Sequence, residues 1–191
     1  MRFQKKSHQV VKNYFFDIMD FLDLLLKRRS VRNFTDENIS KEDLNLILQA
    51  GLLAPTSRNR KPCNFLVVEN KETLKKLSKA KESGSAMLAD CDKAIVVIAN
   101  TLISDTWIED SSIALSFMHL MAANLDIGSC WVQIHLRKDA EGHDSEDVVR
   151  DIVGIDEFHR IVGILALGIP EGKVKPHSLD DIDKEKIHFL P

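Results

Sequence analysis

Apolar residues recur at helical spacing in several stretches of the chain. The clearest is 40–51, where Ser40 stands as a candidate N-cap with Asp43 three residues later, and Leu44 and Ile47 follow on one face. The same spacing predicts further helices over 20–29, 71–81, 109–127 and 144–154. The first of these ends in three cations, which favour the negative end of the helix dipole.

Short apolar runs between these helices predict strands. They cover 65–70, 93–100, 128–136 and 160–168. The run 93–100, KAIVVIAN, is rich in β-branched residues and does not alternate with polar ones, which fits a strand buried on both faces. Helices and strands mix without repeats and without the regular alternation of a doubly wound sheet, so the pattern predicts an α+β fold.

The stretch 109–127 is the longest helical candidate, and Asp110 or Ser111 can cap its start. Its apolar residues cover nearly every side, which is typical of a helix that lies deep in a core or is shared between subunits. A domain of this size can hardly surround such a helix on its own. The pattern therefore favours an obligate homodimer.

Composition narrows the class of partner. The chain has 191 residues, close to one ordinary domain, and 44% of them are apolar, which is enough for a real core. Lysine and arginine total 26 against 29 aspartate and glutamate, so the formal charge is −3. That balance argues against nucleic acid or an anionic membrane as a partner, because both require a broad basic surface. No apolar run approaches the roughly 20 residues of a membrane helix.

The three cysteines are odd in number, widely spread and without a CxxC pair: Cys63, Cys91 and Cys130. This usage predicts neither a disulfide framework nor a zinc site, and it favours a cytoplasmic protein. The start of the chain is basic and then partly apolar, but charged residues interrupt any signal-type stretch. We expect residues 1–18 to be an N-terminal extension and residues 19–191 to form the domain.

The segment RRSVR, which follows the first predicted helix, is the main candidate for binding chemistry. If it is extended, side chains two apart face the same way, about 6.6 Å from each other. Arg28, Ser30 and Arg32 then line one face with two guanidinium groups and a hydroxyl, a good cradle for a phosphate. Residue types alone leave open a solvated basic helix end.

Several common catalytic and ligand motifs are missing from the sequence. No GxGxxG follows a strand and no GxxxxGK[ST] occurs, so neither a dinucleotide fingerprint nor a P-loop is supported. The chain also lacks HExxH and GxSxG, and its histidines have no recognised ligand spacing, so we expect no metal. His119 reads as a hydrogen-bonded core histidine, and Cys130 as a buried, inert thiol.

Four segments taken in order resemble the nitroreductase family of flavin enzymes. They are RRSVRNF, LILQAGLLAPTSRNRKPCNFLVVEN, LDIGSCWVQI and IVGILALGIPEGKVKP, and together they span about Asp20 to Pro176. The resemblance implies a nitroreductase-like fold with a central, mostly antiparallel sheet flanked by helices. It also implies a homodimer that holds FMN at the subunit interface.

The resemblance assigns the flavin phosphate to RRSVR, the basic segment of residues 28–32. Three consecutive residues match the family's Arg-Arg-Ser, which grips the phosphate and ribityl chain: Arg28, Arg29 and Ser30. Arg32 matches a frequent basic residue of the same segment. Lys173 and Lys175 fall where the family often has a second phosphate cation, although a solvated surface pair fits them equally well.

Two further segments are assigned to the flavin ring by the same resemblance. One loop matches the family's loop that reaches the flavin bound mainly by the partner subunit: Pro55, Thr56, Ser57 and Asn59. The segment after the long helix matches residues that lie against the isoalloxazine: Trp131, Val132 and Gln133. Many relatives have Gln-Pro-Trp where this chain has Lys61-Pro62-Cys63, a change that we expect to alter the substrate pocket.

The implied activity is an FMN-dependent transfer of hydride from NADH or NADPH to a nitroaromatic, quinone or similar flat acceptor by a ping-pong mechanism. The cofactor performs the redox step, so no catalytic acid–base residue is expected. Two alternatives stay open. In the first, the chain is an FMN-binding relative with a different reaction, such as dehalogenation or flavin breakdown. In the second, it is a non-enzymatic dimeric binding module with RRSVR as a surface patch.

Overall fold

The computed structural model describes residues 21–190. Its centre is a four-stranded sheet in the order β1-β2-β4-β3, in which all neighbouring strands are antiparallel. The strands are β1 (Cys63–Val68), β2 (Lys93–Asn100), β3 (Gly128–Gln133) and β4 (His159–Gly168). The expected extension 1–18 lies outside the described residues. The α+β class and the antiparallel sheet are confirmed.

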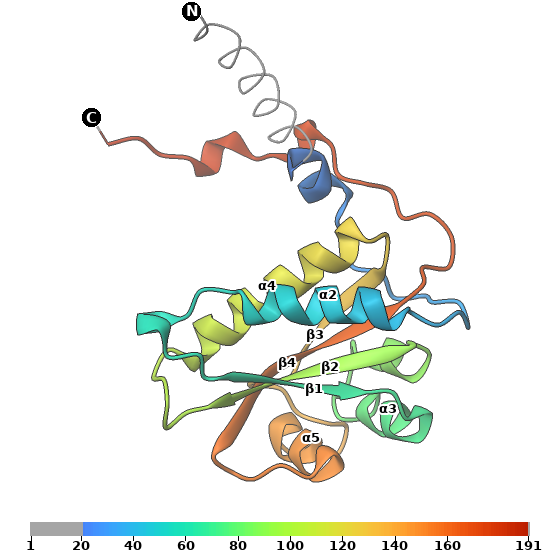
Figure 1. The fold of residues 1–191 in the computed structure, drawn as a ribbon, viewed down its shortest axis with the longest axis vertical. Coiled ribbons are helices and arrows are strands. Elements are labelled where there is room, and N and C mark those ends of the chain that lie inside the picture. Colours follow the sequence, from blue (N-terminus) through green and yellow to red (C-terminus); the bar gives the residue numbers. More distant parts are fainter. Residues whose placement is uncertain (1–20, 191) are drawn as a thin grey trace, which may run out of the picture.

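Helices cover both faces of the sheet (Figure 1). Helices α2 (Lys41–Leu52) and α4 (Trp107–Asn124) pack on one face, and α3 (Lys71–Leu77) and α5 (Ser145–Val153) pack on the other. Residues 21–27 are also helical. Single 3₁₀ turns complete the description: η1 (Ser57–Asn59), η2 (Ala86–Ala89), η3 (Leu179–Asp181) and η4 (Lys184–Lys186).

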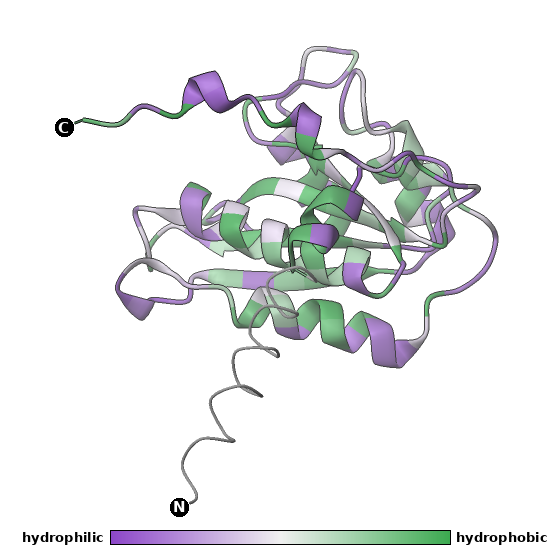
Figure 2. Ribbon diagram, turned by 90° about the horizontal axis from the view of Figure 1, so that it is seen from above, coloured by the Kyte–Doolittle hydropathy of each residue, from purple (hydrophilic) through white to green (hydrophobic). Residues whose placement is uncertain are grey.

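Strand β2 explains why two hydrophobic layers form. Val96 points into the layer under α3 and α5, whereas Ile95 and Val97 point into the layer under α2 and α4. All three side chains are fully buried, as the continuous apolar run predicted. Figure 2 shows hydrophobic colouring along the strands, while the mostly exposed chain after β4 extends away from the sheet.

The sequence predicted most element boundaries to within three residues; the largest difference is α3, which ends at Leu77 and not at 81. The Ser40 cap is confirmed, since its hydroxyl oxygen accepts the Asp43 N–H at 3.0 Å. The N-cap position of the long helix is instead Thr106, whose side chain makes no capping bond, so the prediction of Asp110 or Ser111 as the cap was wrong. The third strand ends at Gln133 and not at 136. Asp110 does not cap its own helix, and its carboxylate bonds instead to the backbone of the loop at Ser57.

The basic segment runs along an edge of the sheet. The Val31 N–H donates to the Ser129 carbonyl at 2.9 Å, and the Thr35 N–H donates to the Ile169 carbonyl at 2.9 Å. Phe34 packs over Gly168, where a Cβ would lie only 2.6 Å from the ring. These contacts fix the segment against the start of β3 and the end of β4. No helix in residues 21–190 is both long and apolar enough to cross a membrane.

Candidate functional site

The cations of the basic segment contact different parts of the fold. Arg28 bonds from Nη1 to His119 Nε2 on α4 at 2.9 Å. Arg29 donates from Nη1 to the Lys175 carbonyl in the C-terminal segment. Arg32 is exposed and lies near the Cys130 thiol on β3, as does the Ser30 hydroxyl. The segment therefore connects α4, the edge of the sheet and the C-terminal chain.

His119 is neutral in the fold. Burial and, to a smaller extent, the adjacent Arg28 charge together lower the pKa of His119 to about 4. Because a guanidinium can only donate, Nε2 must accept from Arg28, and the proton on Nδ1 then donates to Ser129 Oγ at 2.5 Å. The prediction of a hydrogen-bonded core histidine is confirmed.

A cavity of about 370 Å³ opens beside the segment. Lys27, Arg29 and Lys173 supply positive charge to its wall, and Asp126 supplies one negative charge. Lys27 is paired with Asp126, so Arg29 and Lys173 remain as its net positive groups. The structure thus brings together two cations that the resemblance assigned to the phosphate. Lys175 contributes its carbonyl, which accepts from Arg29.

A second group of cations lies near Cys130 on β3: Arg32 and Lys81 act on its thiol, and Arg137 lies beside Lys81. Partial burial lowers the pKa of Lys81, and the neighbouring Arg137 charge lowers it further. Burial raises the pKa of the Cys130 thiol, an effect that Arg32 and Lys81 partly offset. Among residues 21–190, no carboxylate forms an ion pair with Arg32, Lys81 or Arg137.

Sequence reasoning missed Lys81 and Arg137. They follow α3 and β3, without any motif, and the bond from the Glu82 N–H to the Lys138 carbonyl at 2.9 Å holds their two loops together. Only the topology could have found them.

Within residues 21–190, no named strand pairs with the outer edge of β3, and beyond Ser129 this edge is open. The Ser129 carbonyl bonds outward to Val31, whereas the Ile134 N–H bonds inward to β4 at 3.0 Å. By the alternation of an antiparallel strand, the backbone groups of Trp131 and Gln133 also face outward. Their side chains bond to each other, with the indole N–H donating to Gln133 Oε1 at 3.1 Å. Val132 is fully buried on the opposite face, so only its backbone lies near this edge.

The loop with the other predicted ligand contacts lies near the start of α4. The buried Asp110 carboxylate accepts the Ser57 N–H at 2.8 Å and the Ser104 hydroxyl at 2.9 Å. The Thr56 hydroxyl oxygen accepts the Lys61 N–H at 3.0 Å. Three non-glycine residues here have positive φ, a conformation that costs energy and is often kept at functional sites: Arg58, Asn59 and Lys61.

Within one chain, this loop and the basic segment contact α4 at separate turns. Asp110 anchors the loop and His119 contacts Arg28, and the two are about 13 Å apart along the helix axis at 1.5 Å per residue. Pro55, Thr56, Ser57 and Asn59 are therefore not gathered around Arg28 by a single copy.

The Lys61-Pro62-Cys63 variation falls at a small hollow between this loop and α4. Lys61 and Cys63 line the hollow together with Thr56 and Ala114. The Cys63 thiol lies 3.5 Å from the Ser111 hydroxyl, and burial raises the pKa of Cys63. The cysteine thus points toward α4 and is no activated nucleophile.

Two further polar clusters are structural. Burial opposes ionisation of Glu146, but hydrogen bonds from Arg160, His135 and the Ile161 N–H outweigh it and lower the pKa of Glu146 to about 2. Arg160 also lies 5.0 Å from the centre of the Trp107 ring, a cation–π contact. This network ties α5 to β4 and to the start of α4.

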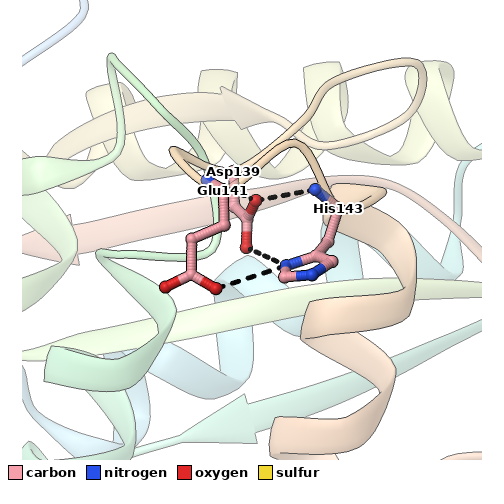
Figure 3. Close-up of side chains that lie close together, drawn as sticks. All are labelled: Asp139, Glu141 and His143. Atoms are coloured by element: carbon pink, nitrogen blue, oxygen red, sulfur yellow. Dashed lines mark hydrogen bonds and ion pairs between the residues drawn. The ribbon is translucent and has the colours of Figure 1, made fainter.

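Asp139, Glu141 and His143 form the second cluster, with possible ligand atoms within 4.8 Å of one another (Figure 3). The Asp139 carboxylate accepts the Glu141 and His143 N–H groups at 2.9 and 2.8 Å, the pattern of an ordinary polar turn. These turn bonds explain the arrangement without a metal.

The fold and site define an α+β protein with a cationic segment laid along an open strand edge. The chain matches the family model described as the nitroreductase family over residues 25–86 and 79–169. A relative from Archaeoglobus fulgidus, provisionally named an NADH dehydrogenase/NAD(P)H nitroreductase, is 35% identical over 172 residues, covering 87% of this chain and 95% of the relative. The chain belongs to the nitroreductase family.

Solved structures agree with this assignment. An FMN-dependent nitroreductase from Clostridium difficile R20291 superposes with a TM-score of 0.86 at 36% identity, covering 88% of this chain and 98% of that one. A nitroreductase with bound FMN from Bacteroides fragilis has the same fold, with a TM-score of 0.71 at 23% identity, covering 90% of this chain and 98% of that one.

Proposed function

We propose that two copies of this chain hold FMN between them and act as an NAD(P)H-dependent oxidoreductase on nitroaromatics, quinones or similar flat acceptors. When bound, FMN supplies the hydride chemistry, taking hydride from NADH or NADPH and passing it to the acceptor in a ping-pong order. The observation that carries the proposal is the spread of positive charge along the basic segment, with one group of cations at each end.

The two groups of cations fit the two electron-rich parts of FMN. Arg29 and Lys173 line the cavity at one end, and together with Arg28, the residue before Arg29, they suit a phosphate. Arg32 and Lys81 lie near Cys130 on β3, with Arg137 beside Lys81, and this group suits the pyrimidine edge of the ring, where reduction adds negative charge. Fixed cations there favour the reduced state electrostatically, without an acid–base residue.

The open backbone groups of β3 add hydrogen-bonding capacity at the same edge. Trp131 and Gln133 turn their N–H and C=O groups outward, where a planar heterocycle with donors and acceptors at its rim can pair with them. The bond between their side chains holds the indole in one orientation. These residues orient the ring, and Val132 between them anchors the strand by its side chain, which is fully buried on the opposite face of the sheet.

A second copy is part of the proposal because one chain keeps its loop and its basic segment apart. Large apolar side chains on α2 and α4 are exposed, including Leu46 at 41% and Phe117 at 40%. An apolar groove of about 290 Å³ lies between these helices and the helical segment 21–27. Packing two such faces together removes this surface from water and brings one copy's loop near the other copy's basic segment.

The test is anaerobic rapid mixing of the FMN-loaded protein with NADH and, separately, with NADPH. We expect the flavin absorption to bleach with at least one nucleotide and to return when a quinone or a nitroaromatic is added. Bound flavin that stays oxidised with both nucleotides would replace this activity with another flavin reaction, such as dehalogenation or flavin breakdown. A protein that binds no FMN would be a non-enzymatic module.

A further inference from the structure

His119 is an unusual residue in its surroundings. It lies on the apolar helix α4 and its side chain is almost fully buried, with 8% exposed. A buried imidazole has to satisfy both ring nitrogens, and His119 does so with two partners from outside its helix. One of these is Arg28, the first arginine of the basic segment.

The geometry fixes the direction of each hydrogen bond. Arg28 has no acceptor, so its Nη1 donates to His119 Nε2 at 2.9 Å. The neutral ring then carries its proton on Nδ1 and donates it to Ser129 Oγ at 2.5 Å. A protonated ring could not accept from Arg28 and would place two cations in contact.

Ser129 on β3 bonds both to His119 and to the backbone of the basic segment. Its side chain accepts from His119, while its carbonyl accepts the Val31 N–H at 2.9 Å. One residue of β3 therefore holds the backbone of the basic segment directly, through Val31, and holds Arg28 indirectly, through His119. Arg28 cannot rotate freely without breaking its bond to His119.

The contact to His119 leaves most of the guanidinium available. An arginine has five N–H donors in a planar fork, and within residues 21–190 the only Arg28 side-chain bond is the one from Nη1 to His119. The side of the fork formed by Nε and Nη2 can still pair with two oxygens of a phosphate. A guanidinium held in place beforehand loses less conformational entropy when it binds.

We propose that neutral His119 is a positioning residue, which orients the Arg28 guanidinium for the phosphate group of the flavin. This inference rests on the proposed function and goes beyond it, because His119 itself touches no cofactor. Its effect must therefore pass through Arg28 and depend on the phosphate. Riboflavin, which lacks the phosphate, provides the matched probe.

The experiment measures the affinity of the apoprotein for FMN and for riboflavin by quenching of flavin fluorescence. The variants are Arg28→Ala, His119→Leu, His119→Gln and the double variant Arg28→Ala/His119→Leu. Glutamine keeps one acceptor and one donor, whereas leucine keeps only volume. Riboflavin binding doubles as the folding control, because a misfolded variant binds neither flavin.

Arg28→Ala should weaken FMN binding about tenfold or more, as expected for one lost charge-assisted bond, and leave riboflavin binding unchanged. His119→Leu should weaken FMN binding by about three- to tenfold, again without an effect on riboflavin, since only the orientation of Arg28 is lost. His119→Gln should restore most of the FMN affinity. In the Arg28→Ala background, His119→Leu should add nothing.

Three results would overturn the inference: equal loss of both flavins in His119→Leu, an additive double variant, or a parent protein that binds FMN no better than riboflavin. A parent that binds neither flavin would instead refute the proposed function itself.

Discussion

At the scale of single residues, burial and hydrogen bonding decide which protonation state each side chain keeps. His119 stays neutral because its site is buried and faces a guanidinium. Glu146 stays ionised although it is buried, because Arg160, His135 and a backbone N–H bond to its carboxylate. Folding lowers the pKa of both groups, but His119 and Glu146 titrate in different ranges of pH.

These shifts predict acid destabilisation in two windows. The pKa of His119 falls from 6.5 to about 4 on folding, so the unfolded chain binds more protons between these values. Stability is complete above pH 6.5 and should fall by up to about 3 kcal/mol as the pH drops toward 4. The pKa of Glu146 falls from 4.5 to about 2, so its contribution is lost as the pH drops through that lower range.

Urea unfolding across this pH range measures both windows, with His119→Gln and His143→Gln as paired variants. His143 is exposed, and the hydrogen bond to the Asp139 carboxylate raises its pKa, so it cannot produce the upper loss. The upper loss should vanish in His119→Gln and persist in His143→Gln. An upper loss that survives in His119→Gln would show that another group causes it.

The sequence revealed residues of the site only where they stand in a motif. The segment from Arg28 to Arg32 was recognisable because its cations are adjacent and match a family pattern. Lys81 and Arg137 carry no local signal, since a lysine after a helix and an arginine after a strand are ordinary surface residues. Only the pairing of their loops brings them to β3.

At the scale of elements, local rules worked where the local contacts decide the outcome. Ser40 caps α2 as its spacing predicted, and the apolar run of β2 is buried on both faces. The start of α4 was mispredicted because Asp110 bonds to a loop distant in sequence instead of capping its own helix. A cap preference is a local rule, and a tertiary contact overrode it.

Asp110→Ala should therefore loosen the loop 55–59. The change removes the acceptor for the Ser57 N–H and the Ser104 hydroxyl in a buried place, so we expect the free energy of unfolding to fall by about 2–3 kcal/mol. Urea denaturation measures this loss. Asp105→Ala is the control. Asp105 stands just before α4, but its side chain is 81% exposed and, among residues 21–190, pairs only with Arg60. Equal losses in the two variants would contradict the anchoring role of Asp110.

At the scale of the whole molecule, the chain carries two sets of candidate ligand contacts that it does not join by itself. The resemblance anticipated this division by assigning the loop to the partner's flavin. The sequence could not have shown it, because the separation depends on where each segment meets α4. The dimer stays a prediction, supported by the apolar groove and the exposed residues on α2 and α4.

Phe117→Glu should break this association. Phe117 lines the apolar groove on α4, and a carboxylate there would be desolvated at the interface. We expect the variant to sediment as a monomer and to lose FMN affinity by about tenfold or more. Phe158→Glu is the matched control, because Phe158 is also exposed, at 54%, but lies in the turn before β4. Loss of FMN in both variants alike would argue against this face as the interface.

Sedimentation followed at the visible flavin absorption tests the central claim most directly, because it reports cofactor and assembly together. The account predicts that the flavin sediments with the protein, in a species of twice the 21.6 kDa of one chain. Flavin absorption that does not sediment with the protein, or that sediments with a single chain, would contradict it.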